Sequence, residues 1–250
     1  MAGAPSFKAM KATQALIALA LGVGLAEVAL AGPKAVVELF TSQGCSSCPP
    51  ADAFLTELAE RDDVIALSLH VDYWDYLGWK DTFGLAENTA RQYAYGKARD
   101  DGKVYTPQMV VNGGGDFVGS NREAVEQALE AAALPVEVSL SRSAGAIEIA
   151  IGAAPDGEPM PGKVTVRLVV YDPAATVVIE RGENKGRTAS YRNVVESMRP
   201  IGMWKGERLE ISLPADEVLH GEANEDYGCA VIVQEDLPGG PGRILGAGRL

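Results

Sequence analysis

Two cysteines three positions apart, Cys45 and Cys48, lie in the segment TSQGCSSCPPAD, directly after the apolar run KAVVELF. Two thiols at this spacing can form a disulfide, exchange it with other thiols, or bind a soft metal ion. Stabilisation through loop closure grows with loop length, so a bridge across two residues stabilises a fold little by that route. This favours a redox pair over an inert structural disulfide, and both interpretations stay open.

The elements around the pair indicate which chemistry it can do. Residues 34–40 predict a buried strand, residues 51–61 predict a helix with Asp52 on its polar side, and residues 64–71 predict a second, parallel strand. A C-x-x-C between a strand and a helix in such a unit is the thioredoxin-like redox arrangement. The free N–H groups and the dipole of a helix N-terminus lower the pKa of a nearby thiol.

We therefore expect Cys45 to be the attacking, more exposed sulfur and Cys48 to resolve the mixed disulfide. Pro49 and Pro50 favour a helix that starts at Pro49, which leaves Cys45 in the loop before it. Glu38, on the first strand, is a candidate buried acid for proton transfer, although the alternative is that it faces solvent.

The chain continues with a loop over residues 72–84 and a helix over residues 85–100. PQMVVN and DFVG predict a hairpin across NGGG, and Ser120 with Glu123 forms a capping box for a helix that Pro135 closes. From Val136 the pattern alternates between apolar and polar residues, which predicts an antiparallel sandwich of about seven strands. The fold class is thus an α/β thioredoxin-like domain (32–134) followed by an all-β sandwich-like domain (135–250).

The first 31 residues resemble a cleaved secretory signal rather than part of the fold. Lys8 and Lys11 precede an uncharged run, and ALA at 29–31 supplies small residues at the cleavage site. An uncleaved anchor is the alternative. Export predicts a periplasmic or secreted protein in an oxidising compartment, with no stable membrane span after signal cleavage.

Composition excludes one class of partner. The 250 residues carry a net charge of −12 and the pI is near 4.7, so a nucleic-acid-binding surface is not expected. We expect no cofactor. The odd cysteine, Cys229, lies in a strongly apolar run and is predicted to be a buried, unreactive thiol.

A metal-binding alternative uses Cys45, Cys48 and His70, with Asp72 in reserve. Two cysteines with a histidine suit Cu(I), and copper-delivery proteins of thioredoxin-like fold combine these residue types. Those proteins space their cysteines one residue wider, however, and a histidine at a strand end is more often a hydrogen-bonded structural residue.

The motifs VVELFTSQGCSSCPPAD, LHVDYWDYLGWKD, TARQYAY, VYTPQMVVNG and ERGENKGRTASYRNVV resemble the family called domain of unknown function 1223, which are secreted bacterial proteins with a thioredoxin-like N-terminal part. The resemblance covers nearly all of the chain after the signal and implies no particular reaction. Thioredoxin-like proteins place a cis-proline opposite the cysteine pair, which implies this role for Pro107. Thr106 would then offer its backbone to a substrate.

The aromatic residues Tyr73 and Trp74 either form a groove wall that binds substrate beside the cysteines or belong to a packed loop. Taken together, these patterns predict an exported thiol–disulfide oxidoreductase-like protein whose partners are thiol- or disulfide-bearing secreted proteins. The alternatives are a soft-metal chaperone and a non-catalytic binding module with a structural disulfide.

Overall fold

The structure is a computed structural model that describes residues 1–3, 32–157, 162–219 and 227–250. The signal predicted for residues 1–31 lies outside the described residues, apart from the first three. The chain divides into two units between residues 30 and 31, and all that follows concerns Ala31–Leu250. No helix among the described residues is long and apolar enough to cross a membrane.

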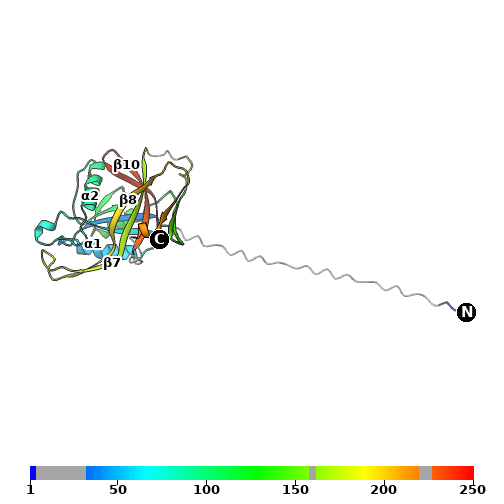
Figure 1. Cartoon of the computed structure of the whole chain (residues 1–250), viewed down its shortest axis with the longest axis horizontal. Coiled ribbons are helices and arrows are strands. Elements are labelled where there is room, and N and C mark those ends of the chain that lie inside the picture. The colour runs from blue at the N-terminus through cyan, green and yellow to red at the C-terminus, as the bar shows by residue number, and fades with distance from the viewer. Residues whose placement is uncertain (4–31, 158–161, 220–226) are drawn as a thin grey trace. The chain divides into compact units, whose positions relative to one another are not determined.

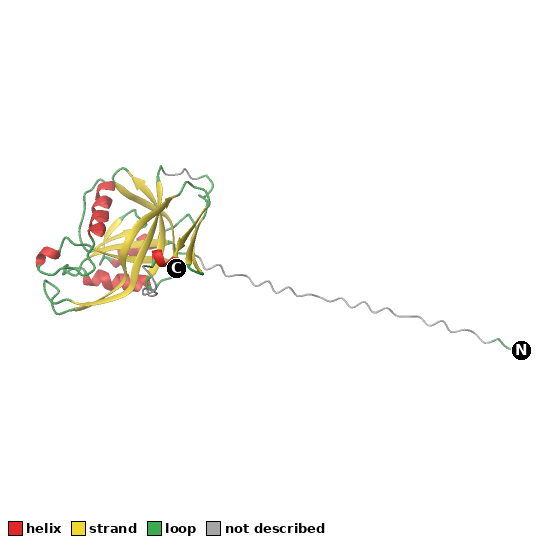
Figure 2. Ribbon diagram, viewed as in Figure 1, coloured by secondary structure: helices red, strands yellow, loops and turns green. Residues whose placement is uncertain are grey.

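Strands dominate this unit, which has a mixed α/β fold (Figures 1 and 2). The strands of the large mixed sheet are β1 (Ala35–Thr41), β2 (Val64–His70), β3 (Gln108–Val111), β4 (Asp116–Val118), β7 (Val164–Val178), β8 (Thr188–Met203), β10 (Gly228–Leu237) and β11 (Gly240–Arg249). A smaller sheet contains β5 (Val138–Ser143), β6 (Ala146–Ile151) and β9 (Leu209–Pro214). The helices are α1 (Pro49–Ala59), the 3-10 helix η1 (Asp75–Leu77), α2 (Ala86–Ala98), α3 (Arg122–Glu130) and α4 (Ala215–Val218).

The order of the large sheet is β11-β10-β7-β8-β2-β1-β3-β4. The predicted parallel pairing of the first two strands is confirmed, and β3 and β4 form the predicted hairpin. All residues of β1 and β2 are buried, as expected for strands covered on both faces. Val37 and Leu39 pack with α1 and α3, whereas Val36 and Phe40 pack with Tyr95 of α2. Odd-numbered residues of β1 therefore face α1, and even-numbered residues face α2.

The capping box predicted for α3 is wrong. The N-cap residue is Asn121, whose side chain accepts a hydrogen bond from the backbone N–H of Ala124 at 3.3 Å. Asn is itself a strong N-cap residue, so the helix begins one position later than Ser120 would have set it.

The small sheet packs against β7 and β10 through a cluster that includes Ile147, Ile149, Val166 and Val231. Cys229 is buried in this cluster, and burial raises the pKa of its thiol to about 11. β7 is one long strand of 15 residues that runs from Val164 to Val178.

The strands on the two sides of residue 134 share the large sheet. β8 pairs in parallel with β2 where Val194 lies opposite Ser68, so β8 joins the first part of the chain to the last. The predicted division at residues 134 and 135 therefore does not separate two sheets, and the division into domains 32–134 and 135–250 stays a prediction. The sequence pattern did not predict β8 or β11 as strands.

Candidate functional site

Cys45 and Cys48 form a disulfide in the loop that joins β1 to α1, with 5.4 Å between their Cα atoms. The helix begins at Pro49 with Cys48 as its N-cap, so Cys45 lies in the preceding loop as predicted. Cys45 is 3% exposed and Cys48 is 0% exposed. Cys45 is thus only slightly more exposed than Cys48, and both cysteines are buried from reagents in solution.

The first turn of α1 offers no free N–H group to a thiolate. Pro49 and Pro50 have no backbone N–H. The N–H groups of Ala51 and Asp52 both donate to the carbonyl oxygen of Cys48, at 2.8 and 3.1 Å. The expected stabilisation of the thiolate by unpaired helix N–H groups is therefore absent at these four residues, and the helix dipole alone is left to act on it.

Thr106 and Pro107 lie beside the cysteine loop. The Oγ of Ser47 is 3.4 Å from the Sγ of Cys45 and donates to the carbonyl oxygen of Thr106 at 3.5 Å. The Thr106–Pro107 peptide bond is cis, as the resemblance implies, and Pro107 is buried. Trp74 Nε1 donates to Thr106 Oγ1 at 2.8 Å, so the structure brings these predicted residues together.

The aromatic loop after β2 packs against the cysteine loop. Tyr73 and Trp74 are half-buried with their ring centroids 5.8 Å apart, and a Cβ on Gly44 would lie 3.1 Å from the Cβ of Trp74. Trp79 Nε1 donates to Gln43 Oε1 at 2.7 Å. These contacts favour the packed-loop interpretation for most of the segment. Tyr76, stacked on Trp74, is 77% exposed.

A residue from a distant part of the sequence, Asn184, also holds the cysteine loop. It lies between β7 and β8, is 3% exposed, and donates through Nδ2 to the carbonyl oxygens of Gln43 and Cys45, both at 2.9 Å. Because Nδ2 meets two acceptors, the orientation of the amide is fixed. The β7–β8 turn is thus docked onto the disulfide loop, which the sequence pattern gave no reason to expect.

His70 is fully buried and bound to Asp81, with Nδ1 at 2.8 Å from Oδ2. Burial alone would raise the pKa of Asp81, but its hydrogen bond to His70 and those it accepts from backbone N–H groups hold it below its usual value. Within the described residues, no three His, Cys, Asp or Glu side chains are grouped so as to hold a metal ion. His70, the histidine of the metal alternative, is thus engaged by Asp81.

Comparison with known proteins identifies the family. Residues 36–234 match the family described as protein of unknown function (DUF1223). The chain belongs to this family. A crystal structure of protein AGR_C_4864 from Agrobacterium tumefaciens is 38% identical, with a TM-score of 0.77, over 89% of this chain and 96% of that one.

A domain of the outer membrane lipoprotein Omp28 from Porphyromonas gingivalis is 10% identical over 46% of this chain and 84% of that chain. Its TM-score of 0.25 is too low to support any argument about the fold. None of the curated proteins matches the sequence.

The buried acid beside the disulfide of this DUF1223 protein is Asp52, not Glu38. Asp52 was expected on the polar side of its helix, yet it is 9% exposed and accepts a hydrogen bond from Thr41 Oγ1 at 2.7 Å. Burial raises the pKa of its carboxyl from 3.8 to about 6, against a smaller opposite effect of Thr41. Thr41 and His70 are partners in the β1–β2 register, so both lie beneath the first turn of α1.

Glu38 is buried on the opposite face of the sheet, because even-numbered residues of β1 face α2. Its carboxylate pairs with Arg91, with Nε at 2.6 Å from Oε1, and accepts a hydrogen bond from the hydroxyl of Tyr95. The solvent-facing alternative for Glu38 is therefore wrong. The ion pair also removes Glu38 from any role at the cysteines.

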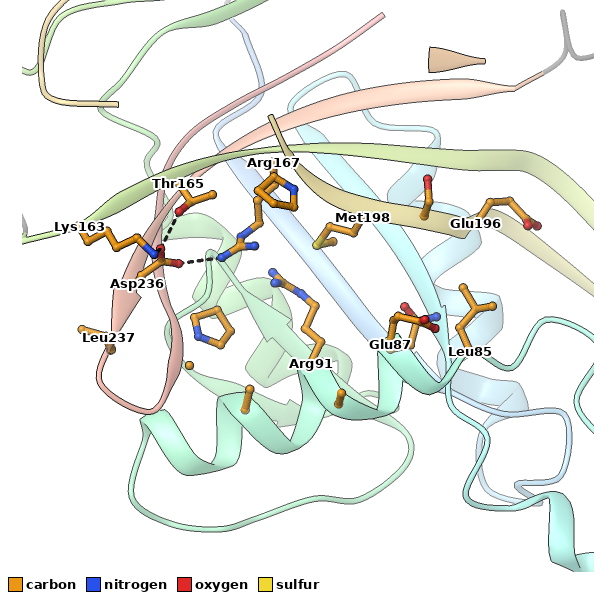
Figure 3. A pocket seen from close by; sticks show the side chains of 17 residues that line it. Leu85, Glu87, Arg91, Lys163, Thr165, Arg167, Glu196, Met198, Asp236 and Leu237 are labelled. Atoms are coloured by element: carbon orange, nitrogen blue, oxygen red, sulfur yellow. Dashed lines mark hydrogen bonds and ion pairs between the residues drawn. The ribbon is translucent and has the colours of Figure 1, made fainter. Parts of the chain in front are cut away.

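Two cavities distinguish the two faces of the sheet. One, of about 840 Å³, lies between α2 and strands β7, β8 and β10 (Figure 3). Figure 3 shows Arg91 and Arg167 entering it from facing elements, but Arg91 is paired with Glu38, and Asp236 binds Arg167 at 2.7 Å and Lys163 at 3.0 Å. Its charges are largely satisfied within the protein. The other cavity, of about 430 Å³, adjoins the disulfide loop.

Proposed function

We propose that this DUF1223 protein exchanges the Cys45–Cys48 disulfide with thiols or disulfides of secreted proteins, outside the cytoplasm. The observation that carries the proposal is the disulfide itself, placed between the carboxyl end of β1 and the first turn of α1 with the Thr106–Pro107 segment beside it. This arrangement supports a thioredoxin-like interpretation of residues 32–134, in which Tyr73 and Trp74 border the substrate site.

The exchange takes two steps. A substrate thiolate attacks the sulfur of Cys45, the Cys45–Cys48 bond breaks, and Cys48 leaves as a thiolate. A second substrate thiolate then attacks the substrate sulfur of the mixed disulfide, which releases an oxidised substrate and leaves two reduced cysteines. In the reverse direction Cys45 attacks and Cys48 resolves. The direction depends on the potentials of the two couples.

Asp52 is the proposed proton acceptor for Cys48. It follows Cys48 by four residues, so the two side chains lie on the same side of the helix start. A carboxyl whose pKa is near 6 can accept a proton from a thiol at neutral pH and return it. An acid retained in a buried position without an ion-pair partner also costs stability, which favours a functional reason for its presence.

The test is the reduction potential of the protein without residues 1–31, equilibrated in glutathione or dithiothreitol buffers and read by alkylation and mass. We expect a value within the range of known exchange enzymes, roughly −270 to −120 mV. Because the first turn of α1 gives the thiolate no free N–H group, we expect the reducing end of that range. A value far below it, or no reduction without unfolding, would overturn the proposal.

One observation favours the alternative of a non-catalytic protein with a structural disulfide, namely the burial of both cysteines under Asn184 and the aromatic loop. A Cys48→Ser variant separates the two functions. It should accumulate mixed disulfides on Cys45 when mixed with a reactive disulfide-bearing protein, whereas a structural site should accumulate none in the folded state.

A further inference from the structure

The cavity of about 430 Å³ lies between the first turn of α1 and the turn that joins β7 to β8. Ser42 and Pro49, which flank the two cysteines in sequence, both line it, although the cysteines do not. Its volume falls within the range of about 300–1,000 Å³ that is usual for small-ligand sites. The cavity therefore adjoins the loop that carries the disulfide and is large enough for part of a small reactant.

One wall of this cavity carries a buried carboxyl group that pairs with no lysine or arginine of the described residues. Asp52 lines the cavity, is more than nine-tenths buried, and forms no ion pair with any lysine or arginine among the described residues. The groups that face it are the hydroxyl of Thr41 from β1, His70 from β2, Asp81 from the following loop and Tyr191 from β8. A ligand ammonium group would offset the cost of burying this carboxylate.

The β7–β8 turn supplies a positive charge to the same cavity, opposite in sign to the Asp52 carboxylate. Arg187 lines the same cavity, is exposed, and forms no ion pair within the described parts of the chain. A guanidinium is the side chain best suited to bind a carboxylate through two parallel hydrogen bonds.

The two walls are held in place relative to each other. Asn184 holds the β7–β8 turn against the cysteine loop through its hydrogen bonds to the carbonyl oxygens of Gln43 and Cys45. The backbone of Arg187 is tied to the same turn, since its N–H donates to the carbonyl oxygen of Asn184 at 3.2 Å. A site with preorganised walls loses less entropy when a ligand binds.

We propose that this cavity binds the α-amino-acid group of a small thiol or disulfide of the cysteine and cystine class, with its ammonium on Asp52 and its carboxylate on Arg187. This inference rests on the proposed thiol–disulfide exchange and assigns a small co-reactant to it. A small molecule also suits a disulfide whose two cysteines are 3% exposed or less, because it can enter where a folded protein cannot.

The reaction is balanced by the small disulfide itself, which is the oxidant. The Cys45 thiolate attacks one sulfur of the disulfide, whose S–S bond breaks and releases one small thiol. Cys48 gives up its proton and attacks the sulfur of Cys45, which forms the Cys45–Cys48 bond and releases the second thiol. Two electrons pass from the protein dithiol to the small disulfide.

The test compares how fast four disulfides oxidise the reduced protein: cystine, cystamine, 3,3′-dithiodipropionate and bis(2-hydroxyethyl) disulfide. They carry both charges, only ammonium groups, only carboxylates, and no charge. Each rate constant is divided by that of dithiothreitol with the same disulfide, which removes differences in intrinsic reactivity. We expect cystine to exceed the uncharged disulfide by about tenfold for each charged contact.

Variants locate the effect. Arg187→Gln should lower the preference for cystine to about that for cystamine. Asp52→Asn should remove the preference for cystamine and lower that for cystine to about that for 3,3′-dithiodipropionate. Lys185→Gln is the matched control, because this exposed lysine belongs to the same turn but does not line the cavity. The preference should be unchanged in this control.

The test distinguishes failure of the amino-acid site from failure of the thiol–disulfide exchange. If the normalised rate constants are equal for all four disulfides, or if Lys185→Gln changes the preference as much as Arg187→Gln does, the cavity does not select the amino-acid group and this inference is overturned. If none of the four disulfides oxidises the reduced protein while it stays folded, the thiol–disulfide exchange itself is overturned.

Discussion

Replacing Asp52 by asparagine should stabilise the protein at neutral pH and leave its stability unchanged in acid. The carboxyl is buried, and its pKa rises from 3.8 to about 6 because burial disfavours the charged form. The native state therefore binds this proton more tightly than the unfolded state does. The contribution of Asp52 to the unfolding free energy therefore falls as the pH rises from 3.8 to about 6, and it is lowest above pH 6.

The size of the effect follows from the two pKa values. Their difference, at 1.36 kcal/mol per pH unit, corresponds to about 3 kcal/mol of unfolding free energy lost above pH 6. Asp52→Asn keeps an oxygen that can accept the hydrogen bond from the hydroxyl of Thr41, and it removes the charge. The variant should thus exceed the parent by up to about 3 kcal/mol at pH 8. At pH 3.5 the two proteins should differ little.

The assay is urea unfolding of the oxidised protein from pH 3.5 to pH 8, with the disulfide intact throughout. Asp156→Asn, at an exposed turn, is the control for removing one negative charge from an acidic protein. If the difference between Asp52→Asn and the parent does not grow with pH, or if Asp156→Asn reproduces it, then burial does not destabilise the charged carboxylate and the reasoning is refuted.

Three further predictions concern other parts of the structure. Arg91→Met leaves Glu38 buried without its cation and should lower the unfolding free energy by about 3–5 kcal/mol in urea unfolding, with partial recovery when Glu38→Gln is added. Asn184→Ala removes two hydrogen bonds to the cysteine loop and should lower the unfolding free energy by about 2 kcal/mol. It should also speed reduction of the disulfide by dithiothreitol, and an unchanged reduction rate would show that Asn184 does not hold the cysteine loop in place. Cys229, whose pKa burial raises to about 11, should not react with iodoacetamide at pH 8 until urea unfolds the protein; labelling of the native state would show that it is accessible.

The sequence predicts the strand, helix and strand around the cysteines because their signals are local. β1 is a run of seven buried residues in which all but Glu38 and Thr41 are apolar, and two prolines mark the start of α1. The same run explains why the role of Glu38 was not predictable. When both faces of a strand are buried, no alternation of polar residues shows which side faces α1, and only the position of α2 decides it.

The site residues that the sequence pattern missed all depend on long-range contacts. Asp52 shares the helical positions of a polar face, but its carboxyl meets Thr41 of β1, and residues of β8 and the β7–β8 turn line the cavity beside it. Asn184 lies in a segment whose composition is typical of a solvated turn. The motif ERGENKGRTASYRNVV carries the family resemblance, and this is the one signal that could have drawn attention to the turn before the structure was known.

Residues 32–134 alone do not make the candidate site. The bonds that fix the cysteine loop come partly from Asn184, and the charges of the adjoining cavity come from Asp52 on one part of the chain and Arg187 on the other. Removing everything after residue 134 would uncover the disulfide, leave β2 as an unpaired sheet edge, and eliminate one wall of the cavity. The match to DUF1223 spans residues 36–234 and so includes Asn184 and Arg187 as well as the cysteines and Asp52. The family match therefore covers the complete site and not the cysteine motif alone.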